Sequence, residues 1–530
     1  MVVRAFPLCK LGRLLRWLKL LLCLALLCLA LARSHDFLSS LRHNVLTERR
    51  FLGLHRCPAC FGTSWCRRFS AGQLTFRGAA QFRLLDRFNR QQVFAGRHTE
   101  PREGPRDVTL KRLGSPAQLA ELDRALCLRA TGRAACDVAK AVLRSEFNRL
   151  NGDPKAGVPP ARLLTPAVVE GWSDLVHCPS QRLLDRVVRR YAETRDSGSF
   201  LLKNLKDSEK ITLLLTIAFN PEPLVMQSFP PDEGWPLAKY LGACGRIVAE
   251  SYVGPPLSDL LSSPWEKRVD LAWQALELAE QLSNNDLDFG LYLLDVRAES
   301  FGVGTRDGRL ILTEASRVLV SDKRHIRQER PAQFDSPYET AHQDCRDSDC
   351  LALSPSRKHL CSRLSHDHNH YAVCRNLLAP LWAGGTRGGA ALLGGAPRPL
   401  AGRLEALLAE CVRPKRPGGR AAAAGELRRW LADLNANYSK LAAAAGIVDV
   451  GGGGTERIRT RGLPLAPPLS YRGRKTWPPR CGEESSSGWF SQSCHDSSAP
   501  LFGAARNVGR VAVANGTACS GARRCGEMSL

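Results

Sequence analysis

The chain has 530 residues, a mass of 58.2 kDa and a formal net charge of +24 at pH 7. Hydrophobic residues make up 44% of it and charged residues 24%, proportions that exclude wholesale disorder and fibrous repeats. Five of the excess charges lie in residues 1–32, five in residues 441–530 and fourteen between them, without interleaved aromatic residues. This spread disfavours nucleic acid as a partner. It favours a solvated basic face, or else a surface for anionic glycans or acidic partners.

The N-terminus has the pattern of a secretory signal. Basic residues precede an unbroken apolar run from Leu20 to Ala32, and Ala30 and Ala32 occupy the −3 and −1 positions of a cleavage site before Arg33. This run is shorter than the ~20 residues that span a bilayer. We therefore expect residues 1–32 to be a cleaved signal, with an uncleaved anchor as the alternative, and the rest of the chain to be luminal or extracellular without a stable membrane span.

The 19 cysteines fall into three groups, with three in the signal, four between residues 481 and 525, and twelve in the body. An even number in a secreted chain predicts a disulfide framework of at most six bridges, whose pairing the sequence leaves open. The twelve candidates are Cys57, Cys60, Cys66, Cys127, Cys136, Cys178, Cys244, Cys345, Cys350, Cys361, Cys374 and Cys411. Two sequons without proline, at Asn437 and Asn515, predict glycosylation.

A compact cysteine module occupies residues 51–70, FLGLHRCPACFGTSWCRRFS. Its C-x-x-C fits either a redox pair or half of a zinc site. A zinc site needs four ligands, and only three cysteines and His55 are close in sequence. We therefore expect structural disulfides here.

Periodicity predicts an alternation of strands and helices along the body. A strand is expected over residues 107–113, where apolar and polar residues alternate around one lysine. The chain then predicts helices at 136–150, 180–193 and 208–218, strands at 222–229 and 245–253, an amphipathic helix at 266–283, a hairpin over 291–320 that turns at Asp307-Gly308, and a largely helical stretch at 375–440. Residues 441–530 are of low complexity and are expected to be disordered.

This order of elements is that of a protein-kinase fold, in which a strand lysine holds the α- and β-phosphates and a helix glutamate positions it. Lys111 takes the place of the lysine. Glu209, near the start of a predicted helix, is the candidate glutamate, and Glu146 is the alternative because the length of the insertion is hard to place.

The catalytic loop is expected around Asp295, because residues 293–300 fit the register of the kinase motif H-R-D-L-x-x-x-N. The first two positions are leucines, and Ser300 and Glu314 stand at the two Mg²⁺ positions where kinases have Asn and Asp. A longer carboxylate and a neutral hydroxyl are a degenerate metal site, and no multi-glycine phosphate loop is visible. The literal D-F-G at 288–290 precedes the catalytic loop and is taken as chance.

Three alternating histidines, His366, His368 and His370, stand in the segment SHDHNHY. They fit either a metal site or an exposed polar loop. The alternate spacing and the polar surroundings favour the exposed loop.

The chain resembles the divergent protein-kinase-domain family of the secretory pathway, in particular its "deleted in autism" branch. The resemblance covers about residues 1–440 and is carried by CPACFGTSWCRRF, LKRLGS, HCPSQRLLDRVVRRYAE, AFNPEPLV, EGWPLAKYLGACGR and LYLLDV. It implies a bilobal kinase-like fold with an insertion in the N-lobe between Lys111 and Glu209. It also implies passage through the Golgi, secretion, and a role as a paracrine growth or survival factor.

We accordingly expect an α+β, bilobal, disulfide-rich protein-kinase-like fold. Its expected parts are a signal (1–32), a cysteine-rich segment with the first strands (33–110), an N-lobe with a helical insertion (111–248), a C-lobe (249–440) and a tail (441–530). A pseudokinase that binds a cell-surface receptor or another secretory-pathway protein is the favoured function. The alternatives are an active luminal kinase, with ATP and Mg²⁺ or Mn²⁺ as cofactors, and a Golgi-resident scaffold.

Overall fold

The computed structural model describes residues 22–24, 44–77, 93–100, 104–150, 163–194, 205–343, 352–378 and 391–444. The strands are β1 (Leu74–Phe76), β2 (Val93–Glu100), β3 (Gly104–Arg112), β4 (Tyr240–Cys244), β5 (Ile247–Ser251), β6 (Phe289–Leu293), β7 (Phe301–Val303), β8 (Leu310–Leu312) and β9 (Val318–Asp322). The α-helices are α2 (Cys66–Ser70), α4 (Pro116–Thr131), α5 (Val138–Leu150), α6 (Pro166–Val169), α7 (Gln181–Glu193), α8 (Asp207–Phe219), α9 (Glu222–Ser228), α10 (Trp265–Ser283), α11 (Lys323–Glu329), α12 (Arg357–Ser362), α13 (His368–Val373), α14 (Arg398–Val412) and α15 (Gly419–Ala444).

The N-lobe contains an antiparallel sheet in the order β1-β2-β3-β5-β4. Along β2 the side chains alternate strictly, because successive residues of a strand point to opposite faces. Phe94 and His98 are buried toward the cysteine module, while Val93, Ala95 and Arg97 are exposed on the other face. The exposed face is the one that carries Lys111, since Val93 stands opposite Lys111 in the register.

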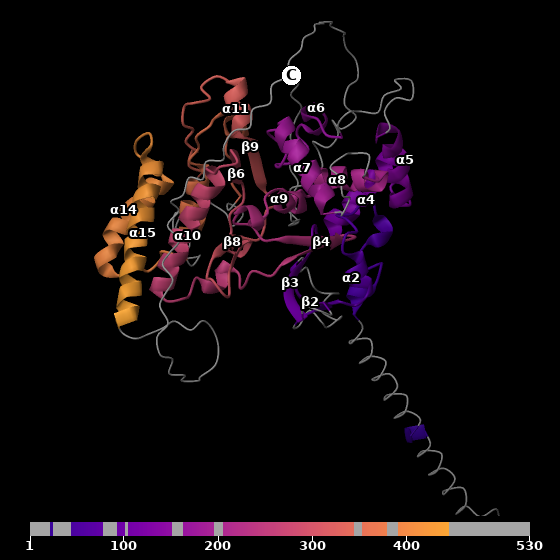
Figure 1. The fold of residues 1–530 in the computed structure, drawn as a ribbon, viewed down its shortest axis with the longest axis horizontal. Coiled ribbons are helices and arrows are strands. Elements are labelled where there is room, and N and C mark those ends of the chain that lie inside the picture. Colours follow the sequence, from indigo (N-terminus) through magenta and orange to yellow (C-terminus); the bar gives the residue numbers. More distant parts are fainter. Residues whose placement is uncertain are drawn as a thin grey trace, which may run out of the picture.

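A group of helices, α4 to α9, separates β3 from β4 in the chain (Figure 1). The sequence enforces the first of them: Ser115 accepts from the backbone of Gln118, whose side chain accepts from the backbone of Ser115, a reciprocal cap. The amphipathic α7 buries one face, including Leu183 and Val187, against the large core and contacts α9. The expected helical insertion in the N-lobe is confirmed.

The C-lobe is built around α10, whose apolar face is buried throughout its length. Helices α14 and α15 lie side by side, and α15 packs against α10 at the edge of the molecule remote from β2 and β3 (Figure 1). Two short antiparallel ribbons, β6–β9 and β7–β8, complete the lobe. No helix of the described residues is long and apolar enough to cross a membrane.

Within the described part of the chain, five disulfides join ten of the predicted cysteines. They are Cys57–Cys60, Cys66–Cys244, Cys127–Cys136, Cys178–Cys361 and Cys374–Cys411. The C-x-x-C of the cysteine module thus forms a disulfide, as expected, and its two thiols do not form half of a zinc site. Cys345 and Cys350 lie outside the described residues, as do residues 445–530 and the sequon at Asn515.

Two predictions of local structure need correction. Residues 222–229 were expected as a strand, but Glu222–Ser228 form the helix α9, fully buried on all sides. An apolar run as short as residues 223–226 carries no periodicity that separates a strand from a buried helix. The hairpin expected over 291–320 is present as β7–β8 around Gly308, but β6 pairs with β9 outside it.

Candidate functional site at the kinase-like cleft

Lys111 lies on β3 and is held by two carboxylates. Its Nζ donates to Glu222 Oε1 at 2.6 Å and to Glu250 Oε2 at 2.9 Å, and it also donates to the backbone carbonyl of Thr313. Glu250 reaches it from β5, because Lys111 pairs with Val248 and strand alternation puts residue 250 on the same face. Glu222 reaches it from the first turn of α9. Three elements remote in sequence thus converge on one ammonium group.

The cluster is almost completely shielded from water. Lys111, Glu222 and Glu250 are 6%, 3% and 1% exposed. Burial alone would lower the pKa of Lys111, but the two carboxylates more than offset it, so that the pKa of the lysine is raised. Burial raises the pKa of Glu222 and raises that of Glu250 to about 7, in each case against the attraction of Lys111.

Asp295 follows β6 at the position expected for a catalytic aspartate. Its Oδ1 accepts from Arg297 Nε at 3.0 Å, and its side chain is 25% exposed. The backbone directly before Asp295 is held by a segment later in the chain, because the N–H of Leu353 donates to Leu294 O at 2.8 Å. The aspartate is therefore presented on an ordered loop and faces a cation two residues away.

Two buried side chains of α13 form hydrogen bonds with the backbone just before the same loop. His368 contacts Leu293 O through Nε2 at 2.8 Å, and Asn369 Oδ1 accepts from Leu293 N at 3.0 Å. The expectation that His366, His368 and His370 are exposed is wrong: His366 is 8% exposed, His368 is completely buried, and the side chain of His370 is 14% exposed. Burial lowers the pKa of all three, so they are neutral structural groups at physiological pH. Among the described residues no three His, Cys, Asp or Glu side chains are placed to hold a metal ion.

Ser300 and Glu314, the residues at the two metal positions, lie together. Ser300 Oγ donates to Glu314 Oε2 at 3.2 Å, and Ser316 Oγ donates to Glu314 Oε1 at 3.3 Å. Backbone bonds from Thr313 and Glu314 to Ser300 O, at 2.8 and 3.2 Å, fix the two segments. The residues expected at the metal site are thus brought together, and both carboxylate oxygens of Glu314 already accept from serine hydroxyls.

These residues do not fit ATP and Mg²⁺ in the arrangement of an active kinase. An ammonium group has three donors, and all three protons of Lys111 are taken by protein oxygens, which leaves none for a phosphate. Glu250 adds a second buried carboxylate beside the lysine, which would repel a phosphate brought near it. The metal positions offer one neutral hydroxyl and one exposed carboxylate.

The structure replaces the expected partner of Lys111. Glu209 lies at the start of α8, where its Oε2 accepts from the backbone N–H of Lys206 at 3.0 Å. A glutamate at this position stabilises the first turn of its own helix. The alternative, Glu146, belongs to α5, and its side chain lies outside the described part of the chain. The glutamate that pairs with Lys111 is Glu222, one helix later.

Sequence reasoning missed four residues of this site: Glu222, Glu250, Arg297 and Asn369. Glu250 carried a signal, because a carboxylate inside the apolar strand 247–251 must find a cation or stay protonated. Glu222 carried a weaker form of this signal, because it stands directly before a short apolar run. Arg297 and Asn369 are polar residues in loop-like surroundings, and nothing in their spacing distinguishes them from solvated residues.

The sequence of this chain matches known proteins over most of its length. A family model described as the protein-kinase domain of FAM69 matches residues 214–414. A divergent protein kinase domain 2A of Homo sapiens is 59% identical over 433 residues, which cover 81% of this chain and 98% of the relative. The chain belongs to the divergent protein kinase domain family.

Other members of the family match over a similar length. The 2A protein of Xenopus tropicalis is 58% identical over 432 residues, 81% of this chain and 98% of the relative. The 2B protein of Homo sapiens is 34% identical over 435 residues, 80% of this chain and 94% of the relative. The expected family and the kinase-like fold are thereby confirmed.

Proposed function

We propose that this chain is a pseudokinase of the secretory pathway that acts as a secreted growth or survival factor by binding a cell-surface partner. The proposal rests on the ammonium group of Lys111, which donates to three protein oxygens. A divergent kinase domain whose lysine has no free donor keeps the fold of a kinase without its phosphate site. Such a fold remains available as a rigid binding surface.

The disulfides support the secretory route. Five bridges among the described residues suit a chain that folds in an oxidising compartment. Two of them, Cys66–Cys244 and Cys178–Cys361, join residues separated by 178 and 183 positions. Bridges of that span constrain the unfolded chain strongly and so stabilise the folded protein. Asn437 is exposed on α15, where it is accessible to a glycan.

An active luminal kinase is the second candidate, and one observation favours it. The chain retains a buried lysine–glutamate pair and an ordered loop aspartate beside a cation, which are parts of a phosphoryl-transfer site. For this function one acceptor of Lys111 must give way to a phosphate oxygen. Release of Glu250 on protonation would achieve that.

Cell binding separates the two candidates. The labelled full chain, collected from culture medium, is added to cells, and saturable surface binding is measured for the wild type and for Asp295→Ala with Glu314→Gln. We expect equal binding and equal growth or survival responses, because neither carboxylate is needed for a binding function. A variant that binds normally but loses the response would support the kinase. Failure of the chain to reach the medium would refute the secreted role and favour a retained scaffold.

A further inference from the structure

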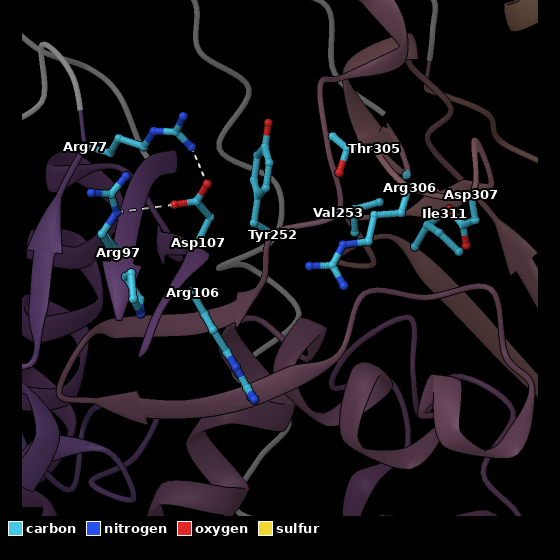
Figure 2. A pocket seen from close by; sticks show the side chains of 12 residues that line it. Arg77, Arg97, Arg106, Asp107, Tyr252, Val253, Thr305, Arg306, Asp307 and Ile311 are labelled. Carbon is cyan, nitrogen blue, oxygen red and sulfur yellow. Dashed lines mark hydrogen bonds and ion pairs between the residues drawn. The ribbon is translucent and has the colours of Figure 1, made fainter. Parts of the chain in front are cut away.

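A second polar site lies away from Lys111, where the N-lobe sheet meets the β7–β8 turn. It is a pocket of about 880 Å³. The start of β3 forms one wall, the segment after β5 forms another, and the turn between β7 and β8 closes it (Figure 2). Asp107, on its wall, precedes Lys111 by four residues of the same strand, which corresponds to about 13 Å. The pocket is therefore distinct from the lysine cluster.

The lining of this pocket is dominated by arginine. Arg77, Arg97, Arg106 and Arg306 line it together with two carboxylates, Asp107 and Asp307. Arg77 pairs with Asp107, and Arg97 pairs with the same Asp107 at 3.7 Å, so that one negative charge serves two guanidinium groups. The Arg77 and Arg97 side chains are each 50% exposed. The site therefore carries an excess of positive charge that water can reach.

The strand register explains why these charges gather. Arg97 stands opposite Asp107 on the exposed face of β2, the same face that carries Val93 and Ala95. Arg306, which is exposed, comes from a turn of the C-lobe more than 190 residues later in the chain. Figure 2 shows Tyr252 between the two groups, with Arg77 and Arg97 on one side and Arg306 on the other. The charges thus surround the pocket and do not converge on one point.

We infer that this pocket binds a sulfated oligosaccharide. Guanidinium groups bind sulfate and phosphate oxygens bidentately, and charges on both sides of the pocket suit a ligand with several separated anionic groups. Tyr252, 38% exposed, offers an aromatic face of the kind against which a sugar ring packs. The volume lies within the range of pockets for molecules of a few rings. Of the formal net charge of +24, five charges lie in the expected signal, and the remaining 24 − 5 = +19 attracts such a polyanion from a distance.

The inference goes beyond the proposed function and does not depend on it, because neither Lys111 nor the catalytic loop lines the pocket. It concerns only where an anionic glycan is held. A kinase and a pseudokinase with these arginines would bind the glycan equally.

Calorimetric titration of the full chain tests the inference with three probes: a sulfated heparin-derived hexasaccharide, the same oligosaccharide after desulfation, and ATP. Two double variants remove two charges each: Arg97→Gln with Arg306→Gln in the pocket, and Arg416→Gln with Arg429→Gln, exposed on the far side of the C-lobe. We expect at least a tenfold weaker affinity for the sulfated probe in the pocket variant and less than a twofold change in the control. Tyr252→Ala, which leaves the charge unchanged, should weaken binding several-fold.

Equal losses in the two double variants would overturn the inference, because they would show attraction by net charge alone. Tight binding of the desulfated probe would overturn it as well, as would ATP binding at this pocket more tightly than the sulfated probe does. Circular dichroism of every variant establishes that the fold is intact.

Discussion

Replacing Lys111 with methionine keeps the length of the side chain and removes its charge. In the wild-type fold the ammonium group pairs with Glu222 at 2.6 Å and Glu250 at 2.9 Å, and these carboxylate side chains are 3% and 1% exposed. The substitution leaves two buried carboxylates beside each other without a cation. Removing one partner of a buried ion pair costs about 3–5 kcal/mol. We expect Lys111→Met to lose about this much of its free energy of unfolding at pH 7.5, a large share of the roughly 5–15 kcal/mol that holds most domains folded.

Denaturant unfolding at pH 7.5 and pH 5 measures the loss. Burial raises the pKa of Glu222 and Glu250, so both take up protons more readily at pH 5 and the loss in Lys111→Met should shrink there. Adding Glu222→Gln and Glu250→Gln to Lys111→Met removes the stranded charges and should recover most of the stability. The control is Lys239→Met, because Lys239 and its partner Asp232 are exposed and such a pair contributes about 0–1 kcal/mol. Equal stability of Lys111→Met and Lys239→Met at both pH values would refute the reasoning.

Three further predictions concern stability. Burial raises the pKa of Glu250 from its ordinary value of 4.5 to about 7. Ionising this carboxyl is therefore harder in the folded state than in the unfolded state, and the wild type loses stability as the pH rises from about 4.5 to 7. Denaturant unfolding of Glu250→Gln should therefore show it gaining on the wild type between pH 5 and pH 8, by on the order of 3 kcal/mol. The double variant Cys66→Ser with Cys244→Ser removes a bridge that spans 178 positions and should lower the free energy of unfolding by about 5 kcal/mol, measured by denaturation without reductant. An unchanged free energy of unfolding would show that the bridge does not form. Arg420→Met leaves Asp367 buried without its cation and should lower the free energy of unfolding by about 3–5 kcal/mol, and a loss below 1 kcal/mol would contradict the pairing.

Local sequence patterns predicted much of the secondary structure correctly. The alternation around Lys111 located β3, and the 3.6-residue periodicity of residues 266–283 located α10 almost to the residue. The catalytic-loop assignment rests on the same kind of short-range pattern, because Asp295, Ser300 and Glu314 lie within twenty residues of one another, and it stays a prediction. Such short-range patterns are imposed by the backbone geometry of each element and need no knowledge of the rest of the fold.

The partner of Lys111 could not be predicted in this way. Lys111 and Glu222 are separated by 111 positions, and the helices α4 to α8 lie between them in the chain. Only the packing of α9 under the sheet decides which of several glutamates reaches the lysine. Glu209 looked suitable because it begins a helix, but a glutamate in the first turn also caps its own helix.

The predicted exposure of the three histidines was wrong for a related reason. His368 is completely buried because its ring holds the carbonyl of Leu293, a contact between residues 75 positions apart. A histidine that anchors backbone and one that faces solvent have the same appearance in a sequence. Burial of a polar ring becomes evident only when its hydrogen-bond partner is known.

The central claim is that the cleft has lost the nucleotide site of a kinase, and thermal unfolding with nucleotide tests it most directly. The full chain is heated with ATP and Mg²⁺, with ATP and Mn²⁺, and with each metal alone. A nucleotide present at 100 times its Kd would add about 2.7 kcal/mol and raise the unfolding temperature. We predict no nucleotide-dependent shift with either metal. A robust shift, together with phosphate transfer that Asp295→Ala abolishes, would contradict the account.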